Sequence, residues 1–375
     1  MSPGFDRRID ALSGFGLAVM ALAGLAVAVS LLVVIALASG TARAQEAPSA
    51  GRQTDKTQSS QNARPVCAGS DLLAKMADSD PARLAGIRRQ AADTPNGDDR
   101  LWKIEKKGVA PSWLYGTMHV TDPRVLALPD AAAKALAGAQ TVVIETIDIL
   151  DPTKAQAEIL AKPDLTMFTD GTTLADHMDA TDLALVKDKL KERGLSYGLV
   201  QRMKPWMLGS MLAVPACEEA RAAAGADFLD EKIAKDAKAE GKTVEGLETL
   251  DEQLEALAGL PMKFHIQGLV ESLKLGDLMD DVTVTMTDLY LKSRIGTILP
   301  MMEAVSPKED EAPGSGYAEF QKRIITDRDA VMAKRAAPII DKGNAFIAVG
   351  ALHLVGKEGV VALLRKAGYT VTGIE

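Results

Sequence analysis

One pattern occurs twice, near opposite ends of the chain, and it limits the possible folds more than any other feature. Residues 113–120 read WLYGTMHV and residues 346–356 read FIAVGALHLVG. Each is an apolar, strand-like run in which a histidine, His119 or His353, follows a glycine by three positions. The chain has only 4 histidines, so the repeat directs attention to both runs.

A helix pattern and then a second strand pattern follow each run. After His119 these are residues 128–139 and 141–147, and after His353 they are residues 356–368 and 369–375. A helical crossover returns the chain to a parallel strand, and the loops after parallel strands lie at their carboxyl ends. Both histidines are therefore predicted at one edge of one sheet.

The remaining segments complete the predicted fold. Residues 67–95 have a helical pattern, and residues 101–108 and 111–119 resemble two strands joined by a turn. Residues 152–300 are mostly helical, with one short strand in KTVEGL, and residues 317–341 form one or two further helices. We predict a mixed α/β fold: one mixed sheet made from the two terminal units, with a large helical insertion at about 152–300.

The amino-terminal region has the composition of an export signal. Residues 14–40 carry no charge, Arg7 and Arg8 precede them, and the small-residue sequence ARA follows at 42–44. Residues 1–44 are interpreted as a cleaved signal peptide or a retained inner-membrane anchor, because the apolar run is long for a signal. Residues 45–66 are predicted to be a polar linker, and residues 67–375 a periplasmic or membrane-anchored domain facing the periplasm.

Charge and cysteine content narrow the function further. The formal net charge is −8, and such an acidic chain does not favour nucleic acid as a partner. The two cysteines, Cys67 and Cys217, both follow the proposed signal. In an oxidising compartment they are candidates for one disulfide, the alternative being two separate buried thiols.

The predicted site combines the two histidines with one glutamate. Glu145 follows the apolar run TVVI, and a carboxylate there would lie at the same sheet edge. Gly116 and Gly350 would let the backbone turn and keep the site uncrowded. Two imidazoles and a carboxylate can hold a catalytic divalent ion, with Glu145 as ligand or as general base. The alternative is that these groups are structural.

Other candidates are weaker. Glu375 occupies the position analogous to Glu145 in the second unit, but as the last residue it is interpreted as a solvated tail. His177 and His265 occur in helical contexts and are interpreted as structural.

These motifs, together with GLET at residues 246–249, make the sequence resemble the TraB/PrgY/GumN family over about residues 68–374. That family is related to the Tiki metalloproteases and to the erythromycin-esterase and ChaN-like fold. The resemblance implies a peptidase that depends on Mn²⁺, Co²⁺ or Zn²⁺, with His119 and His353 as metal ligands and Glu145 as the catalytic carboxylate.

The resemblance also implies supporting roles for Glu248, Gln253 and Arg328. Asp329 stands where many members have asparagine, which leaves the partner of Arg328 open. The expected function is an exported metal-dependent hydrolase acting on a peptide or other small substrate in a cleft. Two alternatives stay open: a non-catalytic protein that binds haem, peptide or polysaccharide, and a metal-free esterase-like hydrolase that uses the same His and Glu.

Overall fold

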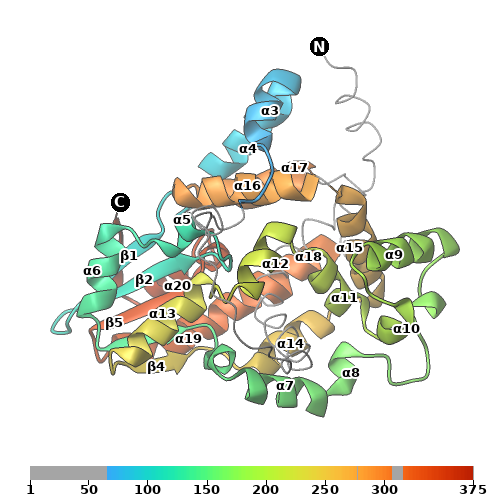
Figure 1. The fold of residues 1–375 in the computed structure, drawn as a ribbon. Helices are drawn as coiled ribbons and strands as arrows, with labels where there is room; N and C mark the ends of the chain where they lie inside the picture. Colours follow the sequence, from blue (N-terminus) through green and yellow to red (C-terminus); the bar gives the residue numbers. More distant parts are fainter. Residues whose placement is uncertain (1–65, 277, 306–315, 375) are drawn as a thin grey trace, which may run out of the picture.

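A computed structural model describes residues 66–276, 278–305 and 316–374. Its centre is a sheet of strands β1 (Leu101–Glu105), β2 (Ser112–Thr117), β3 (Thr141–Ile144), β4 (Thr243–Gly246), β5 (Ala345–Gly350) and β6 (Thr370–Ile374). The strand order is β4-β3-β5-β2-β1-β6. The sheet occupies one side of the molecule and most of the helices lie on the other (Figure 1). The predicted mixed α/β class is confirmed.

The two strands that precede the histidines are neighbours at the centre of the sheet. β2 pairs with β5 in parallel, with Gly116 opposite Val349 and Thr117 opposite Gly350. β5 also pairs in parallel with β3, which pairs in parallel with β4, whereas β1 is antiparallel to both β2 and β6. The two units are therefore interleaved: β5 of the second unit lies between β2 and β3 of the first.

Helices fill the intervals between these strands. Up to β3 they are α3 (Leu72–Ser79), α4 (Pro81–Ala92), α5 (Pro123–Leu126) and α6 (Asp130–Gly138). Between β3 and β4 the chain forms η1 (Ile147–Leu150), α7 (Pro152–Ala161), α8 (Pro163–Thr166), η2 (Leu174–Asp176), α9 (Ala180–Glu192), α10 (Tyr197–Val200), α11 (Pro205–Leu212), α12 (Ala216–Ala223) and α13 (Leu229–Ala239).

Between β4 and β5 come α14 (Leu250–Ala258), α15 (Met262–Leu275), α16 (Leu278–Leu291), η3 (Ile295–Thr297), α17 (Ile298–Val305), α18 (Gly316–Phe320), the π-helical turn η4 (Gln321–Thr326) and α19 (Asp327–Ile340). After β5 come η5 (Ala351–His353) and α20 (Val360–Lys366). The short strand expected in KTVEGL is β4. It lies between helices, as the sequence pattern indicated.

Several element boundaries differ from the sequence expectation, and the differences concentrate at the predicted site. The strand expected over 141–147 ends at Ile144, so Glu145 lies just beyond it. The second strand-like run, at residues 346–356, continues as a strand only to Gly350, and His353 lies in the 3₁₀ turn η5. The helix expected from 356 begins only at Val360. Hydrogen bonding between neighbouring strands ends at the carboxyl edge of the sheet, and the backbone turns there.

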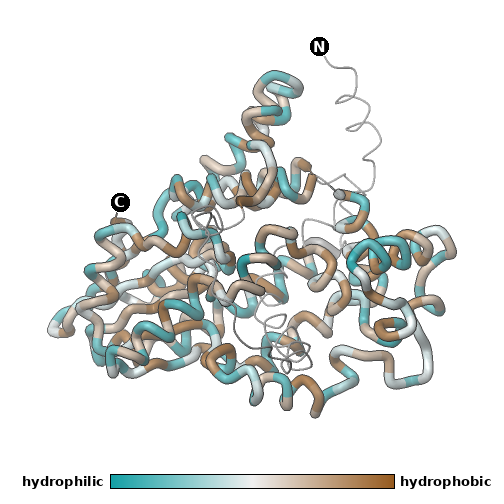
Figure 2. Tube along the Cα trace, viewed as in Figure 1, coloured by the Kyte–Doolittle hydropathy of each residue, from teal (hydrophilic) through white to brown (hydrophobic). Residues whose placement is uncertain are grey.

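The core explains why β5 reads as an uninterrupted apolar run. All six of its residues are buried, as expected for a central parallel strand covered on both faces. Helix α13 packs against β3 and β4, α19 against β5, and α20 against β6. By contrast, α9 is coloured largely hydrophilic in Figure 2, and of its residues only Val186 and Leu190 are buried.

A disulfide joins Cys67 to Cys217 on α12, across 150 positions of sequence. The interpretations of residues 1–44 as signal or anchor and of 45–66 as linker, like that of Glu375, fall outside the described residues, apart from Val66, which is exposed and outside any helix or strand. Within the described residues, none of the helices has the length and apolar character needed to span a membrane.

Candidate functional site

Three predicted side chains meet at the carboxyl edge of the sheet. The Nε2 atom of His119 lies 3.7 Å from Oε1 of Glu145, and the Nε2 atom of His353 lies 3.9 Å from the same oxygen. The three residues follow the carboxyl ends of strands β2, β3 and β5. All three side chains are at most about one-tenth exposed. Two imidazoles therefore face one carboxylate oxygen in a nearly enclosed space.

Gly350 completes the enclosure around that oxygen. Its backbone N–H donates a 2.7 Å hydrogen bond to Oε1 of Glu145. A Cβ at this position would lie 3.1 Å from that oxygen and 3.4 Å from Nε2 of His119. Gly116 has a different role, because a Cβ there would lie 2.8 Å from the side chain of Leu354. Gly350 thus leaves room for the site, and Gly116 leaves room for the packing of the neighbouring loop.

A carboxylate lies behind each imidazole. Nδ1 of His353 is 2.6 Å from Oδ1 of Asp329, on α19. Nδ1 of His119 is 2.9 Å from Oδ2 of Asp230, on α13. The second contact lacks the alignment of a hydrogen bond, and neither of its two atoms has a hydrogen-bond partner among the described residues. In both half-sites the contact at Nδ1 leaves Nε2 facing Glu145.

Arg328 connects the two glutamates. Its Nη2 atom donates to Oε2 of Glu145 and to Oε2 of Glu248, both at 2.7 Å, and its Nε donates to Glu248 at 3.1 Å. Gln253 adds longer contacts to the same two carboxylates, at 3.3 and 3.4 Å. The partner of Arg328, which the sequence left open, is therefore this pair of glutamates, while Asp329 is the partner of His353.

The backbone holds the same two segments together. The N–H of Glu248 donates to the carbonyl of Glu145 at 2.7 Å, directly after the paired strands β3 and β4. Asp148, in η1, accepts a hydrogen bond from the N–H of Leu250. Thr249 then begins α14 with a capping box, which places Gln253 in the first turn beside the glutamates. The GLET stretch is therefore the turn that brings the second glutamate to the first.

The site carries an excess of buried negative charge. Glu145, Glu248, Asp230 and Asp329 are each at most 7% exposed. In the described part of the chain, Arg328 is the only cation, apart from the imidazoles, that forms an ion pair with any of them. With neutral imidazoles, four carboxylates and one guanidinium have a formal charge of about −3, so the site attracts cations.

The pKa values reflect this imbalance. Burial acts to lower the pKa of His119, but Asp230 and Glu145 outweigh burial and raise it to about 10. Burial raises the pKa of Asp329 to about 6, although His353 acts in the opposite direction. Burial alone would raise the pKa of Glu145, but the charge of Arg328 and the two imidazoles hold it well below its usual value. The carboxylates around His119 therefore favour a positive charge on its imidazole, so His119 retains its proton to a higher pH.

The donor atoms of these side chains are of the types that bind a divalent cation. In the present conformation, however, they are too far apart to coordinate one ion together. Across residues 66–276, 278–305 and 316–374, no group of three or more His, Cys, Asp or Glu side chains meets the spacing of a formed metal centre. Ligand bonds of about 2.1 Å in a tetrahedral site place ligand atoms roughly 3.4 Å apart. The separations of 3.7 and 3.9 Å exceed that value by a few tenths of an ångström.

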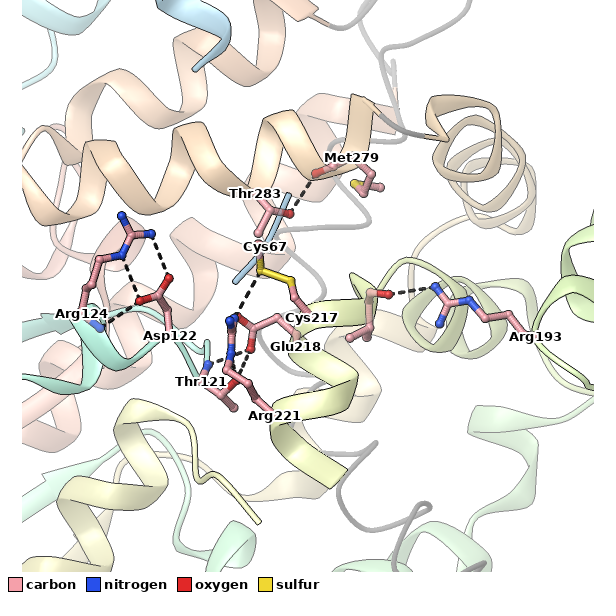
Figure 3. The surroundings of a disulfide bond; sticks show 11 residues. Cys67, Thr121, Asp122, Arg124, Arg193, Cys217, Glu218, Arg221, Met279 and Thr283 are labelled. Carbon is pink, nitrogen blue, oxygen red and sulfur yellow. Dashed lines mark hydrogen bonds and ion pairs between the residues drawn. A yellow bond between two sulfur atoms is a disulfide. The ribbon is translucent and has the colours of Figure 1, made fainter. Parts of the chain in front are cut away.

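Helix α12, which carries Cys217 of the disulfide, forms hydrogen bonds with the loop that carries His119. Thr121 donates from its backbone N–H and its hydroxyl to Oε2 of Glu218 on α12. Arg221 pairs with Glu218, donates to the Thr121 hydroxyl and approaches Sγ of Cys67 at 3.3 Å (Figure 3). The first histidine loop is therefore fixed from α12 as well as from α13.

The other two histidines lie away from this edge. His177 stacks on Phe168 with ring centroids 4.5 Å apart, and its Nε2 is 3.0 Å from the Thr172 hydroxyl. Nε2 of His265 is 2.9 Å from the carbonyl of Leu260. Burial lowers the pKa of His265 to about 4. Both have local partners consistent with a structural role.

Sequence reasoning missed Asp230 and the Glu218–Arg221 pair. Asp230 lies in the first turn of an amphipathic helix, where an aspartate is common for reasons unrelated to catalysis. Glu218 and Arg221 are likewise charged residues three positions apart on a helix, an ordinary surface pattern. Only the folded arrangement shows that all three are buried against the first histidine loop.

Comparison with known proteins assigns the chain to a family. The model of the TraB/PrgY/gumN family matches residues 100–373, which include both histidine motifs, Glu145, Glu248 and Arg328. The chain belongs to the TraB/PrgY/gumN family. Among curated proteins, this family member is 24% identical over 322 residues to a protein named Metalloprotease TIKI homolog from Nematostella vectensis, covering 74% of the chain and 67% of that relative.

Two further relatives have similar scores. Metalloprotease TIKI2 of Danio rerio is 26% identical over 320 residues, covering 72% of this chain and 60% of the relative. Metalloprotease TIKI1 of Homo sapiens is 25% identical over 318 residues, covering 72% of this chain and 61% of the relative. The chain thus spans about three-fifths to two-thirds of the length of these relatives. No solved structure matches it significantly.

Proposed function

We propose that this family member is an exported, metal-dependent hydrolase with peptidase-like activity. The distant relatives named as metalloproteases support a hydrolase of this general class. The apolar segment at residues 14–40 and the Cys67–Cys217 disulfide support export, since disulfides persist in oxidising compartments. The proposed location is the periplasmic side of the inner membrane, either free or anchored.

One observation carries the proposal: two Nε2 atoms face a single carboxylate oxygen in a buried cluster with excess negative charge. His119, His353 and Glu145 would hold Mn²⁺, Co²⁺ or Zn²⁺. A divalent cation bound there would supply Lewis-acid chemistry and make water more acidic. The close approach of the three groups favours this function over a non-catalytic binding protein.

The protein's own groups have distinct roles in this proposal. The depressed pKa of Glu145 makes it a weak base, which favours the role of ligand over that of general base. Arg328 is buried and its donors are directed at the two glutamates, so it orients Glu145 from behind instead of contacting substrate. Gly350 fixes Oε1 of Glu145 through its N–H and leaves the space beside both imidazoles open.

The test combines elemental analysis with a peptide-cleavage screen on residues 67–375. Wild-type protein is expected to retain one divalent ion and to cleave peptides, and chelation should abolish cleavage. His119→Ala should lose both the ion and the activity. His177→Ala is the matched control, because His177 lies away from the site. Equal metal content and equal activity in wild type and His119→Ala would exclude the proposed function.

Metal-free hydrolysis by the same residues is the second candidate function. It is favoured by one observation: among the described residues, no group of three or more His, Cys, Asp or Glu side chains is spaced to hold a metal ion. In that case His119 and Glu145 would activate water directly. Turnover that persists after exhaustive chelation, but is lost in His119→Ala, would favour this candidate over the metal-dependent one.

A further inference from the structure

We propose that Asp230 is the positioning residue for His119: its carboxylate holds Nδ1 and thereby directs Nε2 towards Glu145. This inference rests on the proposed function, because it assigns to α13 a role in building the same site. Within the described residues Asp230 contacts His119 and Thr117 but forms no hydrogen bond or ion pair with Glu145, so it acts through His119.

The contact between the two residues is close and exclusive. Oδ2 of Asp230 lies 2.9 Å from Nδ1 of His119 as an ion-pair contact, and neither atom has a hydrogen-bond partner within the described chain. Asp230 is 2% exposed. Burying a carboxylate oxygen without a partner is unfavourable, so this carboxylate and this imidazole are each the only group that can compensate the other.

The rest of Asp230 is held in place independently of the histidine. Its Oδ1 accepts a 2.6 Å hydrogen bond from the hydroxyl of Thr117, the last residue of β2. Phe228, which precedes α13, presents its ring edge-on to the His119 imidazole with centroids 5.7 Å apart. Strand end, helix start and histidine therefore form one unit: Thr117 anchors Asp230, and Asp230 sets the orientation of the imidazole.

The second half-site provides an internal comparison. His353 has the same arrangement, with Asp329 at 2.6 Å from Nδ1 and Nε2 facing Glu145. The two carboxylates come from different helices, α13 and α19. A carboxylate on the far nitrogen fixes the ring and makes the near nitrogen a stronger donor to a metal, and its loss typically weakens binding by about 10–100-fold.

The first experiment measures Co²⁺ binding to otherwise intact protein by the visible absorption of the bound ion. Asp230→Asn keeps the size of the side chain and removes its charge, while Thr117→Val removes only the anchor. We expect Kd for Co²⁺ to rise about 10–100-fold in Asp230→Asn and by a smaller factor in Thr117→Val. Glu231→Gln is the matched control, because Glu231 is the buried neighbour of Asp230 on α13 and pairs with Lys235. The Kd of the Glu231→Gln variant for Co²⁺ should be unchanged.

The second experiment needs no metal and separates this inference from the proposed function. Histidine-selective ¹⁵N NMR of the metal-free protein reports the state of each ring nitrogen. We expect the Nδ1 resonance of His119 to shift in Asp230→Asn and to stay in place in Glu231→Gln. An unchanged Nδ1 resonance, or an unchanged Co²⁺ affinity in Asp230→Asn, would overturn the positioning role. If the wild type binds no Co²⁺ but the Nδ1 resonance of His119 still shifts in Asp230→Asn, only the proposed metal function is overturned.

Discussion

Replacing Arg328 by methionine tests whether the guanidinium holds the site together. The substitution leaves Glu145 and Glu248 buried side by side without their shared cation. Breaking a buried ion pair by removing one partner costs about 3–5 kcal/mol, because the remaining charge stays unsolvated. We expect the free energy of unfolding to fall by about that amount at pH 7, as measured by urea denaturation.

Arg335→Met provides a matched control on the same helix. Arg335 also lies on α19 and also pairs with a glutamate from the β4–α14 region, Glu252, but both side chains are about two-fifths exposed. Pairs between exposed side chains typically contribute less than about 1 kcal/mol. Comparing the two variants therefore isolates burial, since helix, residue types and substitution are the same.

The pH dependence of the Arg328→Met effect has a definite sign. In the wild type the pKa of Glu145 is depressed, so its contribution to stability is present above the ordinary value of 4.5 and is lost as the pH falls below it. Without Arg328 the chief cause of the depression is gone, and protonation of Glu145 relieves the variant. The loss of stability should therefore be larger at pH 7 than at pH 4. Equal losses at the two pH values, or equal losses in Arg328→Met and Arg335→Met, would refute the reasoning.

Three other perturbations have expected outcomes. Gly350→Ala places a methyl group 3.1 Å from a Glu145 oxygen, so activity and Co²⁺ affinity should fall severely while unfolding experiments show a loss of about 1–3 kcal/mol. Burial lowers the pKa of His265 to about 4, so on acidification His265 takes up its proton at a higher pH in the unfolded chain than in the folded one. The free energy of unfolding should therefore fall by about 3 kcal/mol from pH 6.5 to 4. Denaturation curves of His265→Gln should show a weaker dependence on pH over this range. Replacing Cys67 and Cys217 by serine opens a loop of 150 positions and should lower the unfolding free energy by about 2–5 kcal/mol; an unchanged urea midpoint would show that the loop is held closed by other contacts.

The sequence predicts the parts of the site that lie at strand ends. Strand patterns are local, and a histidine or glutamate directly after an apolar run must lie near a sheet edge. The positions of His119, Glu145 and His353 after such runs are therefore enough to predict that the three side chains converge. The mixed α/β class follows from the same runs, since a helix between two strands predicts a crossover.

The sequence does not predict the helical side of the site. Asp230 is 111 positions from His119 in sequence and lies in an ordinary amphipathic helix, so only tertiary packing brings it to Nδ1. The apolar patterns also extend β3 and β5 too far, because ladder pairing stops at the edge where the functional groups begin. The π-helical turn η4, immediately before the helix of Arg328 and Asp329, has no recognisable sequence signal either.

The interleaving of the two central strands also determines when the site can exist during the life of the chain. β5 must insert between β2 and β3, and the N–H of Ala345 binds the hydroxyl of Ser112 across 233 positions. Contacts so distant in sequence form slowly and only after most of the chain is available. A chain still being synthesised therefore carries His119 and Glu145 without His353 and Asp329. The arrangement acts as a delay: the proposed catalytic groups converge only once the carboxyl-terminal segment has been made and has added β5 to the sheet.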